Sequence, residues 1–107
     1  MSAPLTTIGL MGKFVFDSVS DASGSRYSAV SLDGQGQLVV EIHDIGGTFD
    51  EYQSVETYTA EQTDQLRALL GTNIISGVAA RFASGAELAE FAEAQGIGRG
   101  KVWNWIS

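Results

Sequence analysis

The fold is decided by residues 37–71, QLVVEIHDIGGTFDEYQSVETYTAEQTDQLRALLG, which contain the signals of two strands, a loop and a helix in direct succession. The helix is the clearest of these elements. Thr59 and Gln62 have the spacing of a capping box, in which each side chain satisfies a free backbone N–H of the other residue. A leucine stripe at helical spacing follows, and Gly71 is the residue type at which helices commonly end. The stretch therefore predicts a strand, a loop, a second strand and a capped amphipathic helix.

The first strand of this stretch has expected partners on its N-terminal side. Residues 13–19 (KFVFDSV) are rich in β-branched and aromatic residues and end in a polar turn, and residues 26–33 (RYSAVSLD) alternate along their length. The glycine-rich segment DGQGQ then joins the second of these strands to residues 37–44 as a hairpin. Residues 1–12 are only weakly patterned, which predicts an irregular N-terminal arm.

Two more helices are expected after this stretch. Residues 73–83 repeat apolar side chains at helical spacing, and a second capping box at Ser84 and Glu87 begins a helix that ends at Gly96. The resulting order is ββββααα. It predicts an α+β fold, with a four-stranded antiparallel meander and about three helices packed on one face. We expect residues 1–107 to form a single domain, because a chain of this length buries enough surface for one core.

Composition excludes several classes of protein. The chain contains no cysteine, so a disulfide framework, a thiolate zinc site and a cysteine nucleophile are all excluded. The first residues, MSAPLTTIGLMGKF, have no early positive charge and no continuous apolar run, so we expect neither a signal peptide nor a membrane span. These features favour a cytoplasmic protein, and the sequence indicates no cofactor.

Acidic residues outnumber basic ones and are unevenly distributed. Thirteen Asp and Glu against six Lys and Arg give a net charge of −7, which attracts basic partners and repels nucleic acid and anionic membranes. Residues 37–71 contain seven of the thirteen carboxylates, and no Lys or Arg lies between Arg26 and Arg67. An acidic surface also keeps a protein soluble, so charge alone leaves both explanations open.

Aromatic residues lie among the acids of the 41–64 segment. Phe49 and Tyr52 flank two carboxylates, and aromatic anchors surrounded by charge are typical of partner-binding surfaces. Alternatively, both rings fold back onto the sheet edge as core. The carboxylates could also surround a divalent ion, but their spacing does not fit a calcium loop, so we expect no metal site. The candidate partner-binding residues are Asp44, Phe49, Asp50, Glu51, Tyr52 and Glu56.

His43 is the only histidine in the chain, so a general-base role would depend on it or on carboxylates alone. Glu41 is predicted on the same strand face and could orient the imidazole. The sequence contains no nucleophile-elbow motif and no second histidine for a metal pair. We therefore expect a solvent-facing strand histidine and a protein that is not an enzyme.

Residues 91–106 (FAEAQGIGRGKVWNWI) have two interpretations. Their pattern is similar to the helix-turn-helix of bacterial regulators, with a turn at residues 96–98 followed by a recognition helix. Glycines at the start of that helix and the acidity of the whole chain argue against this interpretation. The alternative is a C-terminal segment that docks Trp103 and Trp105 onto the sheet. The residues that would contact DNA in the first interpretation are Arg99, Lys101 and Asn104.

Six short motifs mark the chain between residues 36 and 105. They are a D-[IL]-G turn, an acidic aromatic loop, a Y-T strand end, a helix closing in L-L-G, an F-x-x-x-x-G-I segment and a final W-x-W, at residues 44–46, 49–52, 58–59, 69–71, 91–97 and 103–105. Together they resemble a group of small acidic actinobacterial proteins that are uncharacterised or have immunity-like roles. The resemblance implies a small acidic fold that blocks a basic toxin or effector, and it assigns no catalytic residue.

Our leading hypothesis is a non-enzymatic domain of the immunity or inhibitor type, which engages a basic protein partner through the acidic aromatic surface of residues 41–64. The alternative is a small DNA-binding transcription regulator that uses residues 91–106. A homodimer formed through an exposed sheet edge is a further option.

Overall fold

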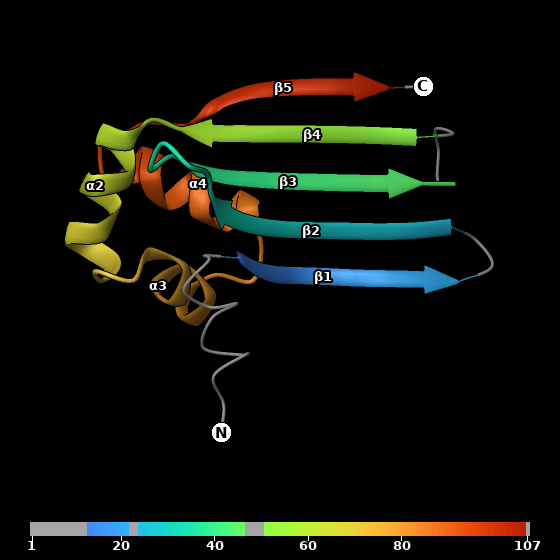
Figure 1. Ribbon diagram of the computed structural model, residues 1–107, viewed down its shortest axis with the longest axis horizontal. Coiled ribbons are helices and arrows are strands. Elements are labelled where there is room, and N and C mark those ends of the chain that lie inside the picture. The colour runs from blue at the N-terminus through green and yellow to red at the C-terminus, as the bar shows by residue number, and fades with distance from the viewer. Residues whose placement is uncertain (1–12, 22–23, 47–50, 107) are drawn as a thin grey trace.

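One antiparallel sheet and three helices make up the fold (Figure 1), and the computed structural model describes residues 13–21, 24–46 and 51–106. Each strand pairs with the next strand along the chain, and the helices lie in sequence between the fourth and fifth strands. The fold is therefore α+β. Its elements in chain order are β1 (Lys13–Asp21), β2 (Gly24–Leu32), β3 (Leu38–Ile45), β4 (Glu51–Tyr58), α2 (Ala60–Leu70), α3 (Ile74–Arg81), α4 (Gly85–Ala94) and β5 (Lys101–Ile106).

The order of elements is ββββαααβ, which corrects the predicted ββββααα and the predicted four strands. The added strand is β5, which pairs antiparallel with β4. Val102 and Ile106 have helical spacing, but the same residues also fit a strand, and β4 offers an open edge of backbone donors and acceptors. The helix-turn-helix interpretation of residues 91–106 is wrong, because the regular element that follows α4 is a strand.

The connection from α4 to β5 turns at two glycines. Gly96 and Gly98 have positive φ angles of 77° and 90°, a backbone region that glycine adopts without steric cost. The side chain of Gln62 holds this connection in place. Its carbonyl oxygen accepts from the N–H of Thr59 at 2.9 Å, and its amide nitrogen donates to the carbonyl oxygen of Ile97 at 3.2 Å. The predicted capping box is thus confirmed, and it also positions the segment that leads into β5.

Alternation along the strands gives the sheet two different faces. Residues directly opposite each other share a face, so the pairs Leu38–Tyr58 and Val40–Glu56 identify one of them, which we call the helix face. We call the other the open face. Its side chains include those of Lys13, Val15, Tyr27, Glu41, His43, Ile45, Glu51, Lys101, Trp103 and Trp105.

The hydrophobic core lies between the helix face and the three helices. The N–H of Leu38 donates to the buried hydroxyl of Thr63 at 3.0 Å, which ties β3 to α2. Figure 1 shows the helices gathered at the end of the sheet where β2 and β4 end, so they cover only part of the strands. The buried residues of the core cluster are Val30, Leu38, Val40, Tyr58, Leu66, Ile74, Ile75, Val78, Leu88 and Ala92.

Candidate functional site

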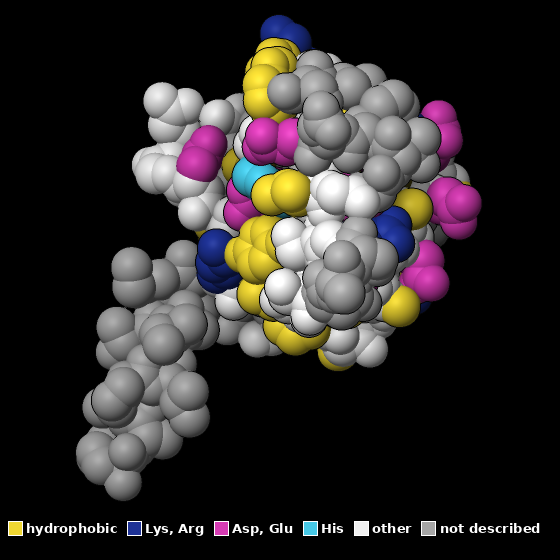
Figure 2. Space-filling view, turned by 90° about the vertical axis from the view of Figure 1, so that its right-hand side faces the viewer, with side chains coloured by type: hydrophobic (Ala, Val, Ile, Leu, Met, Phe, Trp, Pro, Cys, Tyr) yellow, Lys and Arg dark blue, Asp and Glu magenta, His cyan; other side chains and the backbone are white. Residues whose placement is uncertain are grey.

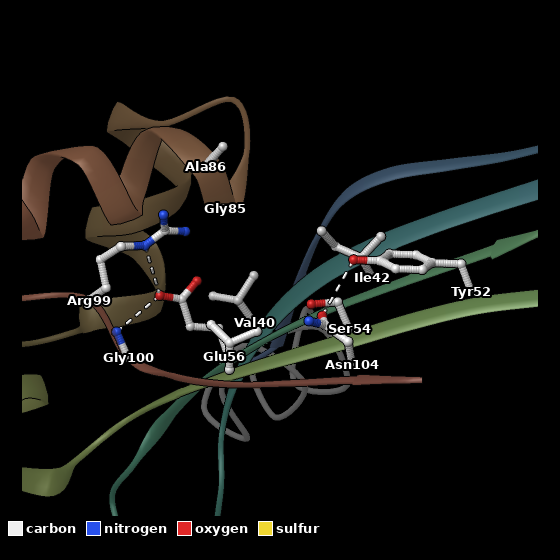
Figure 3. Close-up of a pocket in the computed structure, with 11 residues that line it drawn as sticks. Val40, Ile42, Tyr52, Ser54, Glu56, Gly85, Ala86, Arg99, Gly100 and Asn104 are labelled. Carbon is white, nitrogen blue, oxygen red and sulfur yellow. Dashed lines mark hydrogen bonds and ion pairs between the residues drawn. The ribbon is translucent and has the colours of Figure 1, made fainter. Parts of the chain in front are cut away.

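A cleft of about 490 Å³ lies on the helix face, beside the N-terminus of α4 (Figure 3). Apolar side chains of β3 and β5 line it, namely Val40, Ile42 and Val102. Polar side chains of β4 and β5 and the 99–100 segment complete the lining. A volume of this size is in the range of small-ligand sites, which combine apolar walls with a few placed polar groups.

Gly85 allows α4 to lie directly against β3 at the edge of the cleft. A Cβ atom at this position would lie 2.5 Å from Cγ1 of Val40, so a larger residue would force the helix away from the sheet. Gly85 is the first residue of α4, and the hydroxyl of Ser84 caps the helix by accepting from the N–H of Glu87 at 3.3 Å. The cap and the missing side chain together fix where the helix begins and where the cleft opens.

Glu56 is the buried acid of the cleft, with only 7% of its surface exposed. The N–H of Gly100 donates to its Oε2 at 2.9 Å, and Nε of Arg99 lies 3.6 Å from the same oxygen. No described residue donates to Oε1. Figure 3 shows the carboxylate between Arg99 and Val40. Hydrogen bonds to a charged acceptor are stronger than neutral ones, so this carboxylate holds the start of β5 against β4.

Gly100 is required for this contact. A Cβ atom there would lie 2.8 Å from the carbonyl oxygen of Thr57 and 2.9 Å from Cγ of Glu56. The backbone of the residue therefore reaches the carboxylate only because it has no side chain.

The hydroxyl of Tyr58 lies in the core next to this acid. The side chain is fully buried, and the hydroxyl has no hydrogen-bond partner among the described residues. Burial first, and then the negative charge of Glu56 and the nearness of its carboxylate as an acceptor, raise the pKa of this hydroxyl well above its usual value. Tyr58 thus stays neutral throughout the physiological range.

Tyr52 and Asn104 lie at the other end of the cleft. The hydroxyl of Tyr52 donates to Oδ1 of Asn104 at 3.4 Å, which links β4 to β5 across the helix face. Asp44 is the direct partner of Tyr52 on β3 and therefore shares its face. This end of the cleft is polar, and the carboxylate of Asp44 lies on the same face but outside the lining.

The structure divides the predicted partner-binding residues between two faces. Asp44, Tyr52 and Glu56 share the helix face, whereas Glu51 pairs with Ile45 and points to the open face. Phe49 and Asp50 lie outside the described residues. Two residues proposed for DNA contact, Arg99 and Asn104, line the cleft instead, and Lys101 points to the open face.

Sequence reasoning missed the contact between Glu56 and the 99–100 segment, because the two are far apart in the chain. One signal was available. Glu56 is two residues before Tyr58 and therefore shares its face of the strand, which is the face toward the core. An acid at such a position needs a buried partner. Gly100, directly before the strand that contains both tryptophans, was a second signal, because glycine often marks a place where another part of the backbone approaches closely.

His43 lies on the open face and belongs to a small cluster of charged and aromatic side chains. Its Nε2 is 3.7 Å from Oε2 of Glu41, whose Oε1 is 3.9 Å from Nζ of Lys13. Tyr27 packs edge-on against the imidazole, with ring centroids 6.1 Å apart. The predicted placement of His43 and Glu41 on one strand face is confirmed. Both residues lie outside the lining of the cleft.

Large apolar side chains are also exposed on the open face. Trp103 and Trp105 are 53% and 41% exposed, and Ile45 and Val15 are 45% and 41% exposed. Figure 2 looks at the end of the sheet where β1, β3 and β5 end, and it shows hydrophobic side chains directly beside acidic and basic ones. The predicted docking of both indoles is therefore only partial, because β5 joins the sheet but leaves about half of each ring in solvent.

Comparisons with protein-family models, with curated proteins and with solved structures give no match to this chain. No helix in the described part of the chain is long and apolar enough to cross a membrane. Within residues 13–21, 24–46 and 51–106, no three His, Asp or Glu side chains converge in a way that could hold a metal ion.

Proposed function

We propose that this chain is a non-enzymatic binding domain of the immunity or inhibitor type, which engages a basic protein partner on the helix face. In this proposal, the cleft accepts a Lys or Arg side chain of the partner. The observation that carries it is a cleft in which the apolar side chains of Val40, Ile42 and Val102 and the carboxylate of Glu56 line the same space.

The lining suits the two parts of such a side chain. The methylene stem of Lys or Arg packs on apolar surface while the charged head seeks acceptors. Oε1 of Glu56, the hydroxyl of Ser54 and the side chain of Asn104 offer acceptors within the same cleft. Arg99 uses only the other oxygen of Glu56, so the carboxylate can serve Arg99 and a partner cation together.

Charge outside the cleft supports the same partner. Asp44 pairs with Tyr52 on the helix face, outside the cleft lining, and the whole chain has a net charge of −7. Opposite charges speed the encounter of two proteins and make its rate sensitive to salt. Contacts within the cleft would then decide how long the partner stays bound.

The test uses a fluorescent oligoarginine peptide and a neutral Gly/Ser peptide of the same length, with binding measured by fluorescence anisotropy. We expect salt-sensitive binding of oligoarginine alone. Val102→Phe should fill the cleft and weaken binding, and Asp44→Asn should weaken it about two- to fivefold, as expected for one partly exposed charge beside the cleft. Glu90→Gln on the exposed side of α4 removes the same charge outside the cleft and is the matched control.

Two results would count against the proposal. Equal effects of Asp44→Asn and Glu90→Gln would show that only overall charge matters, and unchanged binding by Val102→Phe would exclude the cleft. Affinity capture from a nuclease-treated lysate of the producing cells then names the partner. A basic protein retained by the wild-type chain and by Glu90→Gln, but lost with Val102→Phe and released by salt, is the expected outcome.

A further inference from the structure

The sheet has two edges among its described strands, β1 and β5, and they differ in how well they could accept another strand. In β1 the pairing with β2 shifts between Val15 and Asp17, and such bulges disturb an edge and hinder further pairing. In β5 the pairing with β4 is regular from Lys101 to Ile106. Natural proteins protect a regular edge with charge or proline, and Lys101 is the only charged residue of this strand.

We propose that β5 pairs antiparallel with β5 of a second copy of this chain, so that two sheets join edge to edge about a two-fold axis. Such an interface is self-complementary, because each copy offers the same strand to the other. This inference does not depend on a basic partner or on the cleft.

Face alternation limits the registers in which this pairing can occur. Opposite residues must share a face, and one register that meets this condition sets Asn104 of each copy opposite its counterpart. Trp103 of one copy then lies opposite Trp105 of the other on the open face. The indoles, now 53% and 41% exposed, would cover one another, and aromatic pairs across strands stabilise a sheet.

Charge complementarity favours a second copy of the chain as the partner of β5, and it favours this register. In this register the two β5 strands run in opposite directions, so Lys101 at the start of one strand lies level with the C-terminal end of the other. Glu51 lies at that same end, because β4 begins at Glu51 and Tyr52 pairs with Ile106. Both side chains point to the open face, and neither forms an ion pair among the described residues. The two-fold axis therefore places each Lys101 two strand spacings, about 10 Å along the sheet, from Glu51 of the other copy, a separation that the two long side chains can bridge on the open face.

The buried area fits a weak dimer. A tryptophan side chain buries roughly 150–250 Å² when fully covered, so the exposed halves of both indoles contribute about 100 Å² each. Even with Val102 and the backbone edges added, the contact stays below the roughly 1,200–2,000 Å² of stable interfaces. We therefore expect a concentration-dependent equilibrium between monomer and dimer rather than a permanent dimer.

Sedimentation equilibrium, measured up to about 1 mM protein, tests the proposal. Lys101→Glu or Glu51→Lys places like charges at both contacts and should weaken the dimer about tenfold or more. The double variant restores opposite charges and the wild-type net charge, so it should recover dimerisation to within about threefold of the wild type. Glu90→Lys changes net charge as Glu51→Lys does but lies on α4, and it should leave the dimer intact.

Three outcomes would overturn the inference. A wild-type chain that remains monomeric throughout the range excludes it, as does a dimer that neither single charge reversal weakens. A double variant as weak as the single variants would show that Lys101 and Glu51 do not meet. Circular dichroism of each variant confirms that the fold is kept, and Trp105→Ser supplies an independent change at the same contact.

Discussion

Replacing Tyr58 by Phe removes one oxygen atom from the core and tests whether that oxygen has a partner. The side chain is fully buried, and its hydroxyl has no hydrogen-bond partner among the described residues. A buried polar group without a partner costs about 1–3 kcal/mol, while the ring that fills the core is kept. We therefore expect Tyr58→Phe to leave the free energy of unfolding unchanged or to raise it by up to about 2 kcal/mol at neutral pH.

Alkaline pH gives a second readout of the same group. Burial and the charge of Glu56 raise the pKa of the Tyr58 hydroxyl above its usual value of 10.0. Because the pKa is higher in the folded state, the contribution of this group to stability is complete below pH 10 and is lost as the pH rises toward the folded-state value. Above pH 10 the wild-type protein should lose about 1.4 kcal/mol per pH unit relative to Tyr58→Phe.

Urea denaturation followed by tryptophan fluorescence measures both effects. The other tyrosines and the lysines are present in both proteins, so the difference between the two curves isolates Tyr58. A loss of more than about 1 kcal/mol in Tyr58→Phe at neutral pH would show that the hydroxyl does have a partner in the folded protein. A difference that stays constant from pH 8 to pH 11 would refute the raised pKa.

Three further changes have defined outcomes in urea denaturation. Glu56→Gln keeps the side-chain volume but makes the bond from the backbone N–H a neutral one, so a loss of about 1–2 kcal/mol is expected, and no loss would mean that the charge is not used. Gly85→Ala should cost about 1–3 kcal/mol because its Cβ meets Val40, whereas Gly34→Ala, which meets open space, is the control. Two backbone N–H groups lower the pKa of Asp33 below 3.8, so Asp33→Asn should be less stable than the wild type at neutral pH. The difference in free energy of unfolding should shrink as the pH falls through the lowered pKa. A difference that persists in acid would contradict this.

Local chemistry was enough to predict most of the fold. The capping box at Thr59 and Gln62 and the cap at Ser84 involve residues within one turn of each other, so their spacing in the sequence indicates the contact directly. Only a few residues separate each of the strands from β1 to β4 from the next, so pairing with the nearest strand was the natural expectation. These elements needed no information about distant residues.

The fifth strand could not be predicted in the same way. Residues 101–106 have apolar side chains that fit either helical or strand spacing, and six residues are too few to decide between them. The deciding interaction is the pairing with β4, whose partner residues lie about fifty positions earlier in the chain. Without that edge, the segment has no local reason to be extended.

The candidate site was predicted in part for a related reason. Glu51 and Tyr52 are neighbours in the sequence, but successive residues of a strand point to opposite faces, so the two side chains lie on different surfaces. Tyr52 and Glu56 are four residues apart and share a face. The role of Arg99 depends on its contact with Glu56. All three helices lie between these two residues in the sequence, so only the folded structure shows that they meet.

Gln62 connects the first turn of α2 with residues 97–99, which lead into β5. Local unfolding of the helix N-terminus is therefore coupled to release of that segment. The same side chain caps the helix and holds the carbonyl oxygens of Ile97 and Arg99. Fraying of the first turn of α2 would therefore release the segment that leads into β5. In native-state hydrogen exchange, the amides of the α2 N-terminus and of residues 97–100 should open as one cooperative unit, at a lower free energy than the amides of β2 and β3. The last strand would then join the sheet late in folding, because its place is fixed only after the helix cap has formed.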